Sequence, residues 1–328
     1  MSTAERIWEM ARAFQPSRVL LTAVELGVFG ILGGQAVESA AVAARMGTDR
    51  RGTDRLLNAL AALGLLAKEG TRFRNAPDTL AALVPGQPGY IGGALGHVVN
   101  LWHTWSTLTD AVRAGTSVYR RDPQAAPEAT RSFIAAMHTI ATGQAQRVVA
   151  QLDLERVRRV LDVGGGSGAY AIELCRARPD LEAVVYDRPE VVPLMAQYVA
   201  EAGLSPRIRA VTGDFNRDEL PSGFDLVFMS QILHSNSPAE NGRLMAQARR
   251  ALEPGGQVVV QEFVPDEGRT SPVPPVLFAL NMLVATAAGD TYTESEIGAW
   301  LTAADFALPR RVDPPGTGTT LLLACLGT

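Results

Sequence analysis

A glycine-rich segment is the part of the sequence whose residue types point most directly to chemistry. Val160–Gly168, VLDVGGGSG, places four glycines after an apolar run and before a helix-like stretch. Glycines let a backbone turn tightly and approach a ligand closely, and the start of the next helix presents free N–H groups. Gly164, Gly166 and Ala169 fit the Gly-x-Gly-x-x-Ala pattern, which is weak alone. Its context predicts a nucleoside-binding loop between a strand and a helix, rather than an unliganded turn.

An acidic residue further along the chain supports a nucleoside ligand. Asp187 ends the next apolar run, at the spacing of about 20 residues where a carboxylate can accept hydrogen bonds from ribose hydroxyls. The same spacing occurs in proteins that bind NAD. The loop and Asp187 therefore leave both NAD and S-adenosylmethionine open.

One histidine follows an apolar run that is typical of a buried strand. In Phe224–His234, FDLVFMSQILH, the histidine comes just past the run, where the carboxyl end of a strand would border a ligand cleft. The unperturbed pKa of imidazole, about 6.5, lets the ring accept a proton from a hydroxyl at neutral pH. His234 is therefore a candidate general base, although a lone histidine is often a hydrogen-bonded structural residue.

The elements that must position these residues alternate along the C-terminal part of the chain. From Arg159 onward the runs RVLDV, EAVVYD, IRAVTGD, FDLVFMS and QVVVQEF are separated by amphipathic helical patterns. This alternation predicts an α/β fold, a doubly wound parallel sheet covered on both faces. The stretch Val273–Gly289 is apolar but interrupted by two prolines and Asn281, so we expect a buried helix and no membrane span.

The N-terminal part has a different pattern. Between Ser17 and Val84 apolar residues recur at helical spacing in several short stretches, the last of them ending in ALGLLAKEG, and we expect glycines 47, 64 and 70 to end helices. TRFRNAP, which follows, is expected to form a small strand pair. We predict a helical, winged-helix-like domain over residues 1–100 and a catalytic domain over 101–328, with a connector at about 120–130.

Such a helical domain raises the possibility of DNA binding. The helix in the recognition position, Gly52–Leu63, carries only Arg55 as a base. The whole chain of 328 residues has 30 Lys and Arg against 34 Asp and Glu, a net charge of -4 that would not attract nucleic acid. We therefore expect dimerisation, a small-molecule partner, and no nucleic-acid partner.

Cysteine content and the first residues bear on the compartment. The two cysteines, Cys175 and Cys325, lie in apolar stretches and have neither metal-site nor disulfide spacing. The first residues, MSTAERIWEMAR, lack the apolar core of a secretion signal. We expect a cytoplasmic protein with no metal site.

Three further features separate S-adenosylmethionine from NAD. Asp162 precedes Gly164 by two residues, Gly-Asp-Phe at 213–215 ends the third strand, and FDLVFMSQILH forms the fourth. Together they resemble the class I methyltransferases, which have a Rossmann-like sheet. The helical N-terminal block and the motif order resemble more narrowly the dimeric small-molecule O-methyltransferases, which include plant caffeate and acetylserotonin enzymes and bacterial antibiotic and carotenoid enzymes. The resemblance implies S-adenosyl-L-methionine as cofactor, a homodimer, and a last strand near TTLLLACL inserted antiparallel.

The resemblance also implies cofactor-binding residues. These are Gly164 and Gly166 against the methionine part and ribose, Asp187 on the ribose, Asp214 and Phe215 around the adenine, and Ser230 and Gln231 on the other side. Each has a structural alternative, since Asp214 could cap a turn and Phe215 could be core.

For catalysis, the histidine matching His234 is the general base of the resembled family, and Glu262 matches an acidic residue that flanks it and could hold its tautomer. Many relatives have Asp-Trp where this chain has Ser235 and Asn236, which leaves the orientation of the acceptor open. No glutamate matches the second flanking acid of the plant enzymes, and Asp290 is a weak substitute.

The acceptor is less well defined. Residues that match the family's acceptor wall, or that could line the same cavity, are Phe133 and Met137 on one helix, with Trp102, Trp105, Phe278 and Met282. Core packing is an almost equal alternative for Phe133 and Met137. A flat apolar phenol or polyketide fits, but the acceptor and the methylated position stay open.

Three alternatives remain at this point. An NAD-dependent oxidoreductase would need a catalytic set such as Tyr-x-x-x-Lys, which the sequence lacks. An effector-binding winged-helix regulator is disfavoured by the acidic charge. A family member that methylates carbon or nitrogen, or has lost methyl transfer, is kept open by the altered residues after His234.

Overall fold

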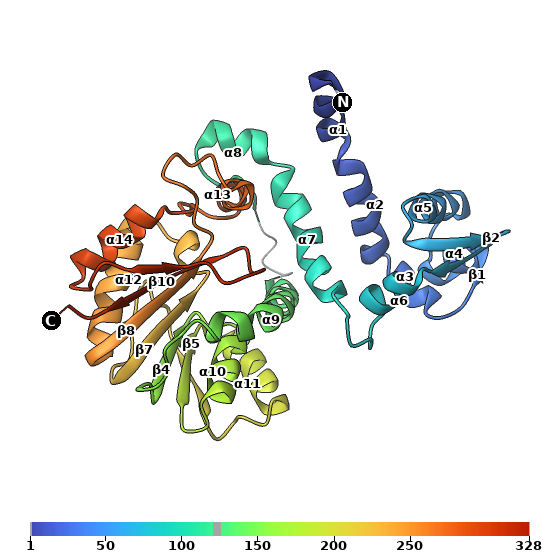
Figure 1. Cartoon of the computed structure of the whole chain (residues 1–328). Coiled ribbons are helices and arrows are strands. Elements are labelled where there is room, and N and C mark those ends of the chain that lie inside the picture. Colours follow the sequence, from blue (N-terminus) through green and yellow to red (C-terminus); the bar gives the residue numbers. More distant parts are fainter. Residues whose placement is uncertain (1, 121–125, 328) are drawn as a thin grey trace. The chain divides into compact units, whose positions relative to one another are not determined.

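The computed structural model describes residues 2–120 and 126–327, and the chain divides into two compact units, Met1–Trp102 and His103–Thr328. Figure 1 shows the elements of each unit. Within the described residues, no helix is both long and apolar enough to cross a membrane.

The N-terminal unit is built of helices around a small sheet. Its elements are α1 (Thr3–Arg12), α2 (Phe14–Glu25), α3 (Val28–Leu32), β1 (Val37–Glu38), α4 (Ser39–Met46), α5 (Arg50–Ala62), β2 (Leu66–Glu69), β3 (Arg72–Asn75), α6 (Pro77–Leu83) and most of α7 (Gly92–Trp105). The strands are antiparallel in the order β1-β3-β2. Fully buried Leu57, Leu60 and Phe73 centre its core. The predicted helical N-terminal domain is confirmed.

Two details of this unit differ from the prediction. Gly47 and Gly64 do follow α4 and α5 with φ of +66° and +76°, but Gly70, with φ +60°, is the turn between β2 and β3. The strand pair therefore begins at Leu66, inside a stretch whose spacing suggested a helix. Because the left-handed turn at Gly64 ends α5, the residues beyond it are free to pair with β3.

The second unit contains a seven-stranded sheet in the order β6-β5-β4-β7-β8-β10-β9. Its strands are β4 (Arg159–Val163), β5 (Glu182–Asp187), β6 (Ile208–Thr212), β7 (Phe224–Ser230), β8 (Leu252–Glu262), β9 (Arg310–Val312) and β10 (Thr320–Cys325). The first five are parallel, and β10 is antiparallel to both β8 and β9. The predicted doubly wound sheet is confirmed, and the antiparallel last strand that the resemblance implied is observed.

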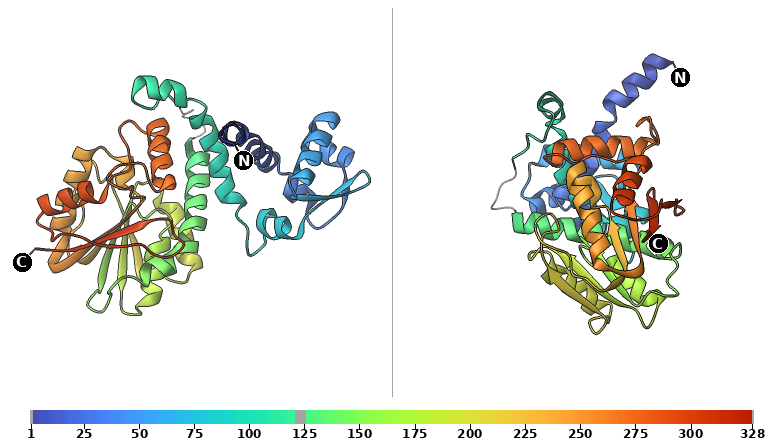
Figure 2. Two further views of the ribbon diagram at one scale, coloured as in Figure 1. Left: turned by 45° about the horizontal axis from the view of Figure 1, so that its top comes forward. Right: turned by 90° about the vertical axis from the view of Figure 1, so that its left-hand side faces the viewer.

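Helices cover both faces of this sheet (Figures 1 and 2). The described helices of this unit, with the end of α7, are α8 (Leu108–Ala114), α9 (Ala126–Val149), α10 (Ala169–Ala177), α11 (Val192–Glu201), the 3-10 turn η2 (Leu233–Ser235), α12 (Pro238–Ala251), α13 (Val273–Ala285) and α14 (Glu294–Ala303). Residues of α9, α10 and α11 share one buried cluster with the strands, and residues of α12 and α14 share the other.

Two expectations for this unit need correction. Of the connector expected at about 120–130, residues 126–130 are helical and begin α9, while 121–125 lie outside the described residues. The helix expected to be buried, α13, buries Asn281, Met282 and Val284 but leaves Val273 and Leu277 at 63% and 50% exposure. The apolar side chains of α13 therefore lie both on the face toward the core and on a face that is exposed.

The sheet order determines where a ligand can bind. Strand β4 lies between β5 and β7, so the chain leaves β4 toward one side of the sheet and later returns on the other. Open α/β sheets bind ligands at the carboxyl ends of the strands where this reversal occurs. The glycine loop, Asp187, Ser230 and Glu262 all lie at such strand ends.

Candidate active site

The glycine loop takes a conformation that side chains would disturb. Gly164, Gly166 and Gly168 have φ of 65°, 58° and 75°, in the left-handed region. A Cβ on Gly164 would lie 2.7 Å from Cγ2 of Ile232, and its N–H donates to the Tyr186 carbonyl at 2.8 Å. The positive φ values and the close approach of Ile232 both require glycine here, so the backbone at the end of β4 is not covered by side chains of the loop.

Asp162 lies directly beneath this loop. Its side chain is fully buried, and neither carboxylate oxygen has a hydrogen-bond partner among the described residues. A Cβ on Gly165 would lie 2.6 Å from its carboxylate carbon. Burial, and then the charge of Asp187, raise the pKa of Asp162 to about 7, while the Ala171 N–H, outside hydrogen-bonding geometry, offsets part of this rise. An unpaired buried carboxylate is costly unless a cationic partner binds it.

Asp187 is held by backbone N–H groups at the end of β5. One carboxylate oxygen accepts from Gly166 at 2.8 Å and the other from Arg188 at 2.7 Å. Burial raises its pKa, and these two hydrogen bonds oppose the rise. Its carboxylate therefore has a fixed direction beside the loop and keeps lone pairs for ligand hydroxyls.

Phe215 and Asp214, both predicted near the adenine, differ in their surroundings. The Phe215 ring reaches the loop, since its Cε1 would lie 3.6 Å from a Cβ on Gly164. Asp214 accepts from the Asn216 N–H at 2.9 Å and pairs with Arg217 at 3.5 Å. It caps a turn, which is the structural alternative that its sequence context allowed.

Ser230 and Gln231 lie at the end of β7, and both are bonded to β8. The Ser230 hydroxyl donates to the side-chain oxygen of Gln261 at 3.1 Å, and the Gln231 N–H donates to the Gln261 carbonyl at 2.8 Å. Gln231 has φ +55°, a conformation that is unfavourable for a residue with a side chain. Such local strain is concentrated at functional sites in proteins.

His234 and Glu262 form a buried pair. Nδ1 of the imidazole lies 2.9 Å from Oε2 of Glu262, and the two residues are 9% and 3% exposed. The other oxygen, Oε1, accepts from the Leu233 N–H at 2.8 Å. Because a carboxylate can only accept, Nδ1 donates to it, and Nε2 of the neutral ring keeps its lone pair. Glu262 is therefore a buried partner of the histidine rather than an exposed strand-end carboxylate.

Residues that follow His234 form hydrogen bonds that hold the backbone of its turn in place. Asn236, 3% exposed, accepts from the Asn216 amide at 3.0 Å and donates to Asn241 at 3.1 Å. Asn241 donates to the Leu233 carbonyl at 3.0 Å, and the Tyr292 hydroxyl donates to the Asn236 carbonyl. Asn236 thus fixes the backbone that carries the histidine. The local sequence does not reveal this role, because Asn216 and Tyr292 lie 20 and 56 residues away from Asn236.

Asp290 supports this turn through its backbone. Its N–H donates to the His234 carbonyl at 3.0 Å, while its carboxylate accepts from Thr291 at 2.8 Å and lies 3.4 Å from Arg269. The preceding Gly289 has no room for a side chain, since its Cβ would lie 2.3 Å from the same carbonyl. These contacts do not favour Asp290 as a second carboxylate on the imidazole.

One face of α13 lies against the histidine turn. Phe278 meets the His234 ring edge to face, with centroids 4.9 Å apart, and packs on Phe263 at 4.6 Å. One turn further, the Asn281 amide oxygen accepts from the Trp105 indole at 2.9 Å, and Met282 is 6% exposed. Of the predicted acceptor wall, the structure thus places Phe278 against His234 and joins Trp105 to α13.

The remaining residues predicted to line the acceptor site, Phe133, Met137 and Trp102, lie on α9 and α7. Phe133 and Met137 lie on α9, where Phe133 is 43% exposed and Met137 is half-buried. Trp102 belongs to the N-terminal unit, where its ring contacts Phe14 and the guanidinium of Arg18. His138, which the sequence did not single out, bonds to the glycine loop through the hydroxyl of Ser167.

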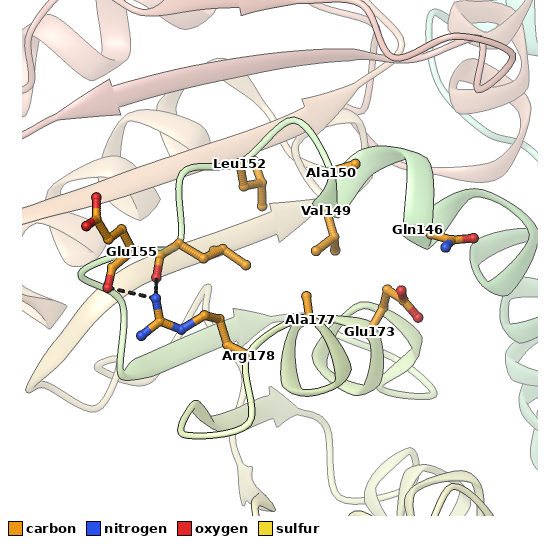
Figure 3. Close-up of a pocket in the computed structure, with 9 residues that line it drawn as sticks. Gln146, Val149, Ala150, Leu152, Glu155, Glu173, Ala177 and Arg178 are labelled. Atoms are coloured by element: carbon orange, nitrogen blue, oxygen red, sulfur yellow. Dashed lines mark hydrogen bonds between the residues drawn. The ribbon is translucent and has the colours of Figure 1, made fainter.

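A cavity of about 370 Å³, shown in Figure 3, lies away from these residues. It is lined by the last turns of α9 and α10 and the segment that follows α9. Arg178 at its rim donates to the carbonyls of Leu154 and Glu155 at 2.9 and 2.8 Å. Because α10 starts at the glycine loop and runs away from it, this cavity is at the opposite end of the helix.

Comparison with known proteins now defines the family. Residues 105–307 match the O-methyltransferase domain, and residues 8–81 match the O-methyltransferase dimerisation domain. The chain belongs to the S-adenosylmethionine-dependent O-methyltransferases. This assignment replaces the oxidoreductase and regulator alternatives.

Individual relatives are similar over nearly the whole chain. A 3-hydroxy-5-methyl-1-naphthoate 3-O-methyltransferase from Streptomyces sahachiroi is 37% identical over 299 residues, 89% of this chain and 86% of the relative. The N,N-dimethyltransferase OxyT from Streptomyces rimosus is 32% identical over 86% of this chain and 84% of the relative. The crystal structure of human N-acetylserotonin methyltransferase with S-adenosylmethionine superimposes with a TM-score of 0.87 at 28% identity, covering 100% of this chain and 99% of the human one. S-adenosylmethionine is accordingly the cofactor.

Proposed function

We propose that this enzyme methylates a phenolic hydroxyl of a small aromatic secondary metabolite, with His234 as the general base. The observation that carries the proposal is the buried hydrogen bond between His234 and Glu262, 2.9 Å long, at the sheet edge that also carries the glycine loop. A lone histidine on an exposed loop would not support this role.

The residues around the loop fit the cofactor. When bound, S-adenosylmethionine supplies an electrophilic methyl group on a positively charged sulfur, together with an ammonium group. Asp162 offers a buried carboxylate that has no partner within the described part of the chain, which suits a cation. The other residues that would hold the cofactor are Gly164, Gly166, Asp187, Phe215, Ser230 and Gln231, whereas the carboxylate of Asp214 caps its own turn.

The proposed roles in the methyl transfer follow from the hydrogen-bond directions. Glu262 accepts the hydrogen bond from Nδ1–H of His234, which leaves Nε2 able to take the proton of the acceptor hydroxyl. As the proton leaves, the oxygen of the acceptor bonds to the methyl carbon. The bond between that carbon and sulfur breaks, and the electron pair stays on sulfur. Alignment can contribute about 7 to 11 kcal/mol and a positioned base about 10² to 10⁴ in rate, so we expect both to matter.

A flat aromatic acceptor suits the side chains near His234. Phe278 packs on the imidazole and Phe263 packs on Phe278, while the Trp105 indole bonds to Asn281 one turn further along α13. Phe133 and Met137 on α9 would complete the wall. A relative named for a hydroxynaphthoate acceptor supports an aromatic ring of this size.

Nitrogen methylation is a second candidate, because one relative at 32% identity is named as an N,N-dimethyltransferase. A neutral amine attacks without first losing a proton, so this reaction would depend less on His234. The two candidates therefore predict different effects of replacing the histidine.

We also propose that the enzyme is a homodimer. The match to a dimerisation domain supports this, as does α1, in which no residue is buried and Ile7, Trp8 and Met10 are 61%, 63% and 74% exposed. Light scattering coupled to size exclusion should give twice the monomer mass of 34.9 kDa. A monomer at micromolar concentration would contradict the proposal.

The acceptor class is tested by product analysis. Purified enzyme is incubated with S-adenosylmethionine and a matched panel of hydroxynaphthoates, phenolic polyketides and their amino analogues, and products are measured by mass spectrometry. We expect a mass gain of one methyl group on a phenolic acceptor. Methylation of the amino analogues alone would favour the nitrogen candidate.

A further inference from the structure

His138 joins three elements around the glycine loop. It lies on α9, and its Nδ1 is 2.9 Å from the hydroxyl oxygen of Ser167, a loop residue that is 3% exposed. On its other side the ring stacks on Tyr198 of α11, with centroids 3.8 Å apart and planes inclined by 19°. One imidazole therefore links α9, the loop and α11.

Neighbouring side chains pack on the same part of the loop. Ile134, one turn before His138 on α9, would lie 3.8 Å from a Cβ on Gly166. Met195 of α11 would lie 3.3 Å from a Cβ on Gly168. Gly166 and Gly168 are thus packed between side chains of α9 and α11. The hydrogen bond between His138 and Ser167 joins α9 to a side chain of the loop.

We propose that His138 is a positioning residue for the cofactor, whose imidazole fixes Ser167 and thereby the backbone of Gly166 and Gly168 in the binding conformation. This inference rests on the proposed cofactor site. It assigns His138 no contact with the reacting atoms, so it predicts an effect on cofactor affinity and not on the chemical step.

The surroundings of His138 favour its neutral form. Burial lowers its pKa, and the charge of Glu201 on α11 opposes this only in part. The other groups that face the ring are the hydroxyl of Ser167, the Tyr198 ring and the hydroxyl of Thr142, 3.5 Å from Nε2. A neutral ring is the suitable one here, because α10 begins two residues after Ser167 with its positive end and the cofactor carries a positive sulfur.

Two substitutions at this position separate the hydrogen bond from the ring stacking. His138→Asn keeps a polar group near the place of Nδ1 but loses the ring. His138→Phe keeps a ring that can stack on Tyr198 but loses the hydrogen bond. Ser167→Ala removes the partner hydroxyl, and Thr139→Val is a matched control, since the Thr139 hydroxyl bonds only to the Ala135 carbonyl of its own helix among the described residues.

The experiment is calorimetric titration of the full chain with S-adenosylhomocysteine. We expect roughly two- to tenfold weaker binding in His138→Phe and in Ser167→Ala, and a double variant no weaker than either single one. His138→Asn should bind more tightly than His138→Phe, and Thr139→Val should match the wild type. With saturating cofactor, kcat of His138→Phe should equal that of the wild type while KM for S-adenosylmethionine rises.

Other results would overturn the inference. Wild-type affinity in His138→Phe, additive losses in the double variant, or a fall in kcat with unchanged KM would each contradict it. If the wild type itself fails to bind S-adenosylhomocysteine, the proposed cofactor site falls as well. Binding by the wild type with no loss in the variants removes the role of His138 alone.

Discussion

The glycine loop and the histidine turn lie at the same edge of the sheet but differ in how well their polar groups are satisfied. Beneath the loop, Asp162 is buried, and neither of its oxygens has a partner among the residues that the structure describes. In the turn, Glu262 accepts from His234 and Leu233, and Asn236 bonds on both sides. The loop is therefore complete only with a ligand, whereas the turn is organised in advance. We expect cofactor affinity and turnover to respond to separate sets of substitutions.

The largest expected effect is on the loop. Gly164→Val adds a branched side chain where φ is +65° and a Cβ would lie 2.7 Å from Ile232, so we expect no measurable S-adenosylhomocysteine binding by calorimetry. Gly164→Ala gives a second, milder variant in case the first unfolds. Gly203→Ala is the matched control, since Gly203 has φ +71° but open space around it. Tight binding of S-adenosylhomocysteine by a folded Gly164→Val protein would contradict the proposal that the glycine loop binds the cofactor.

Asp162→Asn should remove the energetic cost of burying the Asp162 carboxylate without a cationic partner. The pKa of Asp162 is raised to about 7, so the native protein keeps a proton that the unfolded chain releases, and stability falls as pH rises from about 4 to 7. The loss should approach, at most, the order of 4 kcal/mol by pH 8. In urea unfolding without cofactor, Asp162→Asn should be more stable than the wild type at pH 8 and nearly equal at pH 4.

The same substitution should act in the opposite direction on the ligand. Without the carboxylate, Asp162→Asn should bind S-adenosylmethionine more weakly, because a cation loses its buried partner. A variant that is less stable at pH 8 without ligand, yet binds normally, would show that Asp162 serves the fold alone.

Glu262→Gln should have a smaller effect, confined to turnover. The amide can still contact Nδ1 of His234, but it can also donate to it and favour the wrong tautomer. We expect kcat to fall by less than in a variant without the histidine, with S-adenosylhomocysteine affinity unchanged. An equal loss of affinity would mean that the turn and the loop are not independent.

The smallest effect is expected at Asn236. Asn236→Ala removes hydrogen bonds to Asn216 and Asn241 but leaves the imidazole and its carboxylate in place. We expect a melting temperature lower by several degrees and a modest decrease in kcat, measured by calorimetry and initial rates. No change in either quantity would show that the turn holds its shape without this residue.

Strand ends made much of this site predictable from the sequence. Gly164, Asp187 and His234 each follow an apolar run, and parallel strands bring their carboxyl ends to one edge, so their proximity follows from the pattern. The contact of Glu262 with His234 needed the sheet order as well. The predicted strand pair starts earlier than expected, at Leu66, because the spacing of the apolar residues there also fits a helix.

The remaining contacts depend on packing between distant segments. His138 lies on a helix whose periodicity gives no sign that one polar residue faces the loop 29 residues later. The local sequence around Asn236 gives no sign of its role, which its bonds to Asn216 and Asn241 indicate. Local sequence specifies the strand ends, while tertiary contacts specify which polar side chains support them.

The most direct test of the account is His234→Ala, assayed with an accepted phenol at saturating S-adenosylmethionine and titrated with S-adenosylhomocysteine. We expect kcat to fall by about 10² to 10⁴, while S-adenosylhomocysteine affinity stays at the wild-type value. Wild-type kcat in this variant would contradict the role of His234 as general base.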